Sequence, residues 1–94
     1  MDAKEYLRRG QKLLVEGKFR ESIEAFTSSI EGGEETELTY MSRGVALVKD
    51  KQSDSAIEDF SKTISLNKKN SRAHYFRGIA LMVKEDYQNA CTES

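Results

Sequence analysis

Apolar side chains recur along this chain at intervals of three and four residues, and short polar or glycine-containing stretches interrupt them. Tyr40, Gly44 and Leu47, for example, share one face of a helix, because a residue three or four positions along returns to the same side. The polar stretch 49–54 breaks this pattern, which resumes at Ile57. The spacing predicts six helices, near residues 2–16, 19–31, 35–49, 54–66, 71–84 and 87–93.

The predicted helix ends coincide with residues that favour turns. Gly17 suits the positive φ angle that often follows a helix, and Gly32–Gly33 ends the second predicted helix. An asparagine-flanked turn at residues 67–70 ends the fourth. Ser53 or Asp54 is expected to cap the start of that fourth helix, since short polar side chains accept hydrogen bonds from its free amide groups.

The sequence repeats itself with a period of 34 residues. Units Ala3–Thr36, Glu37–Asn70 and Ser71–Ser94 align in this register, and the third unit is ten residues short. The matched residues include Arg9, Arg43 and Arg77; Gly10, Gly44 and Gly78; Leu13, Leu47 and Leu81; Phe26 and Phe60; and Ala56 and Ala90. The register predicts a single domain, residues 1–94, built from stacked copies of one unit.

A helix–turn–helix unit of 34 residues, with glycine in its first helix and alanine early in its second, resembles the tetratricopeptide repeat (TPR). The resemblance covers nearly the whole chain and implies an all-α solenoid of antiparallel helix pairs, about two and a half repeats with a truncated last helix. In this family the two helices of a repeat cross closely where small residues meet. The resemblance therefore implies that Gly44 packs against Ala56 and Gly78 against Ala90, and that Gly10 is likewise structural.

The repeated arginine has its own explanation within the resemblance. Repeats of this type often pair such an arginine with an acid on the second helix, which implies ion pairs from Arg43 to Asp59 and from Arg77 to Glu93. The first unit carries Ala25 in the acid position, so no such pair is implied there. A shared role of the arginines in binding anions is the alternative.

Composition and charge narrow the range of partners. The chain has 15 Lys and Arg against 16 Asp and Glu, so it lacks the basic excess of nucleic-acid and anionic-membrane surfaces. No apolar run approaches the roughly 20 residues that span a membrane, and the first residues contain no secretory signal. We therefore expect a cytoplasmic protein without nucleic-acid or membrane partners. A basic cluster at Lys68, Lys69 and Arg72 leaves phosphate contact as the alternative to a solvated turn.

The candidate nucleophile and base in this sequence are Cys91 and His74. Both occupy positions that the repeat assigns to packing, because His74 aligns with Tyr40 and Cys91 with Ile57. The single cysteine excludes an intramolecular disulfide, and no cysteines and histidines are spaced as ligands of a metal. No glycine-rich phosphate loop is present. The sequence therefore predicts no catalytic residue, no metal, no cofactor and no enzymatic activity.

The first helix of every unit is expected to line a concave face, since stacked helix pairs curve into a solenoid. Most side chains predicted on this face are apolar, which indicates that a partner covers them. The predicted peptide groove consists of Leu7, Gln11, Met41, Ser42, Val45, Arg72, Tyr75, Phe76 and Ile79. The sequence thus predicts a non-catalytic protein-interaction module that binds a peptide or a helix in a largely apolar groove.

The class of peptide is also open to prediction. TPR relatives that bind the acidic C-terminal tails of chaperones use a lysine, asparagines and an arginine at set groove positions. The corresponding positions here hold Leu7, Gln11, Ser42, Arg72 and Phe76. Only Arg72 matches, so binding of acidic tails is not expected.

Self-association is the alternative function. Ser94 stands where Phe26 and Phe60 complete the second helices of the earlier units, so the third unit lacks part of its cover. Two identical chains can supply such cover to each other by exchanging an element. This alternative predicts a homodimer formed through residues 71–94.

Overall fold

A computed structural model of the chain describes the backbone of residues 2–93 and the side chains of residues 2–86. Residues 2–93 form five α-helices and no strand, which confirms the all-α prediction. The helices are α1 (Ala3–Val15), α2 (Phe19–Glu31), α3 (Glu37–Lys49), α4 (Ser53–Leu66) and α5 (Ser71–Glu93). The first four begin and end within two residues of their predicted bounds.

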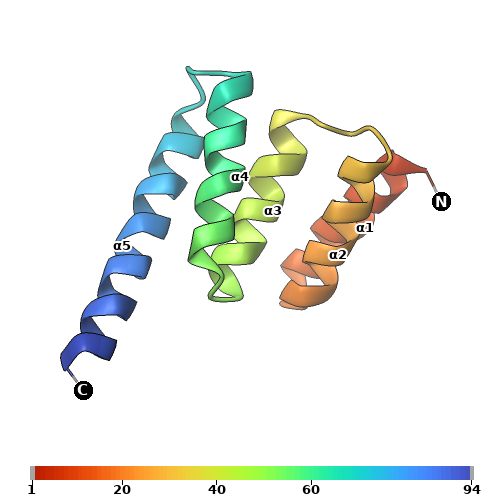
Figure 1. Cartoon of the computed structure of the whole chain (residues 1–94). Coiled ribbons are helices and arrows are strands. Elements are labelled where there is room, and N and C mark those ends of the chain that lie inside the picture. Colours follow the sequence, from red (N-terminus) through yellow and green to blue (C-terminus); the bar gives the residue numbers. More distant parts are fainter. Residues whose placement is uncertain (1, 94) are drawn as a thin grey trace.

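The helices pack in chain order as pairs (Figure 1). Helix α1 packs on α2 and α3 on α4, while α2 also contacts α3 and α4 also contacts α5. In addition α1 contacts α3, and α3 contacts α5. These contacts place α1, α3 and α5 in one layer and α2 and α4 in the other, which is the arrangement of a helical-repeat fold.

The turns inside the two helix pairs close in the same way. Gly17 follows α1 with a φ angle of 81°, as predicted, and the next amide donates a hydrogen bond of 2.9 Å to the carbonyl of Leu13. One period later Lys51 follows α3 with a φ angle of 64°, and the next amide donates to the carbonyl of Leu47 at 2.8 Å. Both first helices therefore end in a left-handed residue that lets the backbone satisfy its own free carbonyls.

The predicted cap of α4 is wrong. Gln52 occupies the cap position and makes no side-chain hydrogen bond there, and Ser53 is already the first helical residue. The reason lies in the preceding turn, where the amide of Gln52 donates to the carbonyl of Leu47. This hydrogen bond places Gln52 directly before the helix, so Ser53 and Asp54 are already helical and cannot act as the cap.

The predicted break between the fifth and sixth helices is absent, because α5 runs without interruption from Ser71 to Glu93. Glu85 stands one period after Lys51 and two after Gly17, and it is helical. Lysine and glutamate have similarly high helix propensities, yet Lys51 forms a left-handed turn and Glu85 stays in the helix, so the residue type at this position does not by itself end a helix. The last residues consequently extend α5 past the turn between α3 and α4 (Figure 1).

Close crossings are present at the first two repeated glycines. A Cβ atom built on Gly10 would lie 2.6 Å from the ring of Phe26, and one on Gly44 would lie 2.6 Å from the ring of Phe60. Both rings are fully buried. The nearest atoms to Gly44 thus belong to Phe60 and not to Ala56, which is buried one turn earlier on α4. The glycines leave room for aromatic rings.

Hydrogen bonds add to this packing in the first pair. Ser22 occupies the position that Ala56 holds in the second pair, and its buried hydroxyl donates to the carbonyl of Gly10 at 2.8 Å. Ser29 likewise donates to the carbonyl of Ala3 at 2.7 Å. These bonds join α2 to α1 and satisfy the two buried hydroxyls.

The third repeated glycine has no such neighbour. Among the described residues, nothing lies within 4 Å of a Cβ atom built on Gly78. The predicted contact between Gly78 and Ala90 is wrong, because both residues belong to α5, twelve positions or about 18 Å apart along its axis. The side chain of Ala90 lies outside the described residues.

Candidate functional site

The predicted groove residues all lie on α1, α3 and α5, the helices of one layer, and we call this set of side chains the first-helix face. Neighbouring helices of this layer touch, so the nine residues extend across three adjacent helices. All of them remain accessible to some degree. Leu7, Gln11, Met41, Ser42, Val45, Phe76 and Ile79 are half-buried, and Arg72 and Tyr75 are exposed.

Two aromatic residues form the best-supported part of this face. The ring of Phe76 stacks on that of Phe60 with centroids 5.8 Å apart, and Tyr75 meets Phe76 edge to face at 5.6 Å. Phe76 also packs against the buried core with Met41 and Val45. Tyr75 is 67% exposed. The first-helix face therefore presents an exposed tyrosine beside side chains that the core immobilises.

A separate open pocket of about 770 Å³ lies where α5 passes the start of α4. An ion pair of 2.6 Å between Lys84 and Asp54 joins the two helices there. The pocket is lined by Lys51, Gln52, Ser53, Asp54, Ser55, Val83, Lys84 and Asp86. None of the nine predicted groove residues is among them. The sequence offers no signal for this pocket, because it forms between segments that are distant along the chain.

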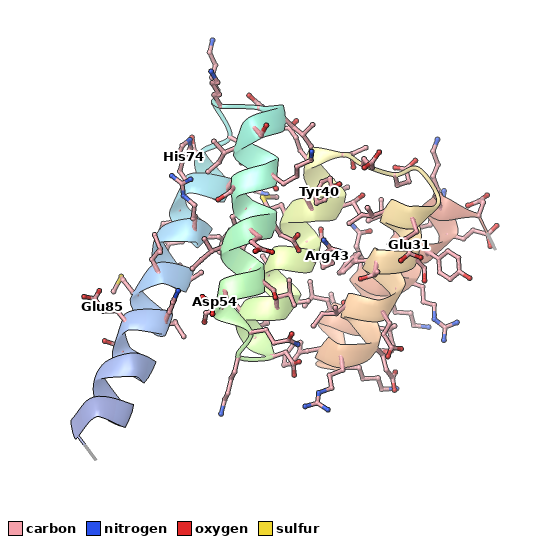
Figure 2. All side chains as sticks on the ribbon, in the orientation of Figure 1. Glu31, Tyr40, Arg43, Asp54, His74 and Glu85 are labelled. Atoms are coloured by element: carbon pink, nitrogen blue, oxygen red, sulfur yellow. The ribbon has the colours of Figure 1, made fainter. Side chains whose placement is uncertain are left out.

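The repeated arginine of the second unit is structural, as predicted. Arg43 donates to both carboxylate oxygens of Asp59 at 2.7 Å, and it also donates to the hydroxyl of Thr27 at 3.3 Å. The hydrogen bond to Asp59 raises the pKa of Arg43 against the opposing effect of burial. Arg43 therefore joins α2, α3 and α4, and Figure 2 places it between α3 and α2. The sequence did not predict the contact with Thr27, because the expected arginine pairs join two helices of one unit, whereas Thr27 belongs to the preceding unit.

The corresponding ion pair of the third unit is not formed. Arg77 and Glu93 belong to the same helix, sixteen positions or about 24 Å apart along its axis, so the predicted pair is wrong. The side chain of Glu93 lies outside the described residues. The cause is again the continuity of α5, since the pair requires a second helix that folds back.

The structure describes no site that contains both His74 and Cys91, the candidate base and nucleophile. His74 is exposed, and its Nε2 donates to the carbonyl of Lys68 at 3.0 Å. The expectation that His74 packs in a core is wrong, because no helix of the described chain covers that side of α5. Cys91 lies outside the described side chains.

Other kinds of site receive no support from the described residues. Within residues 2–86, no group of three or more His, Cys, Asp and Glu side chains is placed to hold a metal ion. Within the described helices, none is both long and apolar enough to cross a membrane.

Comparisons with known proteins agree with this geometry. No protein-family model matches the sequence, and no curated protein matches it. A solved structure, the second TPR of Spaghetti (RPAP3) bound to the HSP90 peptide SRMEEVD, superposes with a TM-score of 0.81 at 26% identity. The match covers 94% of this chain and 88% of that chain. The chain has a TPR fold. In this TPR fold α1–α2 and α3–α4 are the helix pairs, and α5 packs beside them as a single helix.

Proposed function

We propose that this chain is a non-catalytic protein-interaction module that binds an apolar peptide or helix on its first-helix face. The observation that supports the proposal most is the likeness, over 94% of the chain, to a TPR structure that holds a peptide. TPR solenoids offer their partners a concave surface built from successive repeats. The exposed Tyr75 beside Phe76, together with half-buried aliphatic side chains on α1 and α3, favours an apolar ligand.

The composition of the face argues for a ligand unlike that of the solved neighbour. That neighbour binds SRMEEVD, a peptide with a run of acids near its end. On this chain Leu7, Ser42 and Phe76 offer no cation to a carboxylate, and Arg72 is the matching charged group. We propose that SRMEEVD binds more weakly than peptides with apolar anchors.

Selection from a phage-displayed library of random peptides tests the proposal, with the whole chain as bait. We expect enrichment of peptides rich in aromatic and aliphatic residues. The substitution Tyr75→Glu should weaken the selected peptides about tenfold or more, equivalent to about 1.4 kcal/mol, because it places a charge in the apolar contact. Leu66→Glu is the matched control, since Leu66 is also exposed but lies on α4. Equal binding by both variants, or no enrichment, contradicts the proposal.

Self-association through residues 71–94 is a second candidate function. The apolar residues Leu81, Met82 and Val83 are 49%, 64% and 39% exposed on α5, which favours an additional contact there. Light scattering after gel filtration measures this directly, with a reductant present so that Cys91 cannot link two chains. A stable dimer supports the candidate, and a monomer at high concentration rejects it.

A further inference from the structure

One side of α5 lacks the cover that its counterparts on α1 and α3 have. The exposed fraction of the repeated leucine shows the difference, since Leu13 and Leu47 are 9% and 5% exposed whereas Leu81 is 49% exposed. Helix α2 covers α1 and helix α4 covers α3, but no described helix takes that position on α5. In Figure 2, His74 and Glu85 extend from α5 on the side away from α4.

Gly78 on this open side differs from the other two repeated glycines, because no described aromatic ring lies against it. The rings of Phe26 and Phe60 lie against Gly10 and Gly44, so close that an added Cβ atom would be 2.6 Å from each. Gly78 is the glycine one period further on, and a Cβ atom there would meet nothing within 4 Å. By the register of the repeat, the missing neighbour of Gly78 is an aromatic side chain.

The register of the repeat also assigns a cation to this side. Arg43 holds Asp59 of α4 through two hydrogen bonds of 2.7 Å. Arg77 stands one period after Arg43, and among residues 2–86 no carboxylate lies within ion-pair distance of it. An acid that approached α5 as Asp59 approaches α3 would meet Arg77.

We propose that this side of α5 is a docking site for an amphipathic helix of a second protein, distinct from the first-helix face. The chemistry of that helix follows from α4, which presents Ala56, Asp59 and Phe60 to α3. The docked helix carries a small residue, an acid three positions later and an aromatic residue directly after the acid. The acid pairs with Arg77, and the aromatic ring packs on Gly78 and Leu81.

A second copy of this chain does not offer a free helix with the required small, acidic and aromatic residues. Its Phe26 and Phe60 are fully buried in their own helix pairs, so neither is free to dock. In the register of the repeat, the copy has Ala90 in the small-residue position, but it has Ser94 where the aromatic residue is needed. Among the described side chains, the open side of its α5 carries His74, Gly78, Leu81 and Glu85, so two such sides bring no phenyl ring to either glycine. These features favour a different protein as the source of the helix.

A synthetic peptide with the sequence of α4, residues 53–66, is the probe for this site. A lactam bridge between Glu58 and Lys62, both exposed on α4 and one turn apart, keeps the isolated peptide helical. Fluorescence anisotropy of the labelled peptide with the whole chain should show saturable binding. A peptide with Phe60→Ala should bind about tenfold more weakly or worse, because it leaves the glycine position empty.

Substitutions in the chain locate the contact. Gly78→Leu should weaken peptide binding about tenfold or more while leaving the melting temperature of the chain unchanged or higher, because it fills an open position. Arg77→Glu should also weaken binding, and a peptide with Asp59→Lys should recover part of the loss against that variant. Tyr75→Glu is the control on the first-helix face and should leave binding of this peptide unchanged, whatever it does to other ligands.

Three results overturn the proposal. The first is an absence of saturable binding by the bridged peptide. The second is binding that Gly78→Leu does not weaken, since the helix then docks elsewhere. The third is a dimer of the wild-type chain, measured by light scattering, that Gly78→Leu converts to a monomer, because the occupant is then a second copy. None of these results bears on the first-helix face, whose test uses Tyr75.

Discussion

Helices α3 and α5 have matching residues in the same register and very different surroundings. Tyr40 is 7% exposed whereas its counterpart His74 is exposed, and Leu47 is 5% exposed whereas Leu81 is 49% exposed. Helix α3 lies between α2 and α4, while α5 packs on α4, also touches α3, and has no described helix on its other side. The comparison separates two kinds of burial in a solenoid, one provided by the preceding pair and one by the helix's own partner.

The side that faces the preceding pair behaves alike in both helices. Ala46 of α3 and Ala80 of α5 are both fully buried, and so are Thr39 and Ala73, which lie about two helical turns earlier on the same side. Stacking on the preceding second helix is therefore complete in both. The difference at the repeated leucine arises on the opposite side, where α4 covers α3 and no described helix covers α5.

The largest expected contrast comes from the repeated leucine. Leu47→Ala should destabilise the fold by about 2–5 kcal/mol, because it removes buried methyl groups and leaves a cavity. Leu81→Ala should cost less than about 1 kcal/mol, since half of that side chain already meets solvent. Urea unfolding followed by circular dichroism measures both. Equal losses contradict the open side of α5.

Asp59 and Asp54 of α4 give the next contrast. Asp59→Ala should cost about 3 kcal/mol, at the lower end for buried ion pairs, because it leaves Arg43 without its carboxylate and Arg43 keeps 22% of its side chain exposed. Asp54→Ala should cost at most about 1 kcal/mol, since Asp54 is 78% exposed in its pair with Lys84. The same unfolding experiment compares them, and an equal effect of both changes contradicts the structural role of Arg43.

The repeated glycine gives a contrast of opposite signs. Gly44→Leu should destabilise the fold by about 1–3 kcal/mol, because the new side chain overlaps the ring of Phe60. Gly78→Leu should leave stability unchanged or raise it by up to about 1 kcal/mol, since leucine favours helix more than glycine and the position is open. Thermal melting checks the sign. A clear loss in Gly78→Leu means that another segment packs there.

The smallest contrast concerns alkaline pH. Burial and the neighbouring carboxylate of Glu35 raise the pKa of Tyr40 above its ordinary value of 10.0. The unfolded chain therefore loses this proton before the folded chain, so the stabilisation is present below pH 10 and is lost as pH rises through the pKa of the folded state. Tyr40→Phe should flatten this alkaline fall in stability, and His74→Phe at the open counterpart should not.

Part of the packing beside the candidate site was predicted from the sequence. The ion pair of Arg43 and Asp59 was predicted from the resemblance to TPR repeats, which often join an arginine of the first helix to an acid of the second, and the structure shows it as a bidentate pair. The accessibility of Tyr75 on the first-helix face is consistent with its predicted position, whereas the binding role of that face stays a prediction. The packing of Phe76 on Phe60 was not foreseen, since it joins α5 to a helix of the preceding pair.

The sequence by itself determined the local elements of this protein and their order. Helical spacing and turn residues such as Gly17 act over one or two turns, so they identify the first four helices and the repeat that relates them. Only the tertiary structure decided whether a helix end became a turn, as at Lys51, or continued, as at Glu85. It alone also decided that Leu47 is buried and Leu81 is not. The physical reason is that burial depends on a neighbouring helix, and no residue carries that neighbour in its own local sequence.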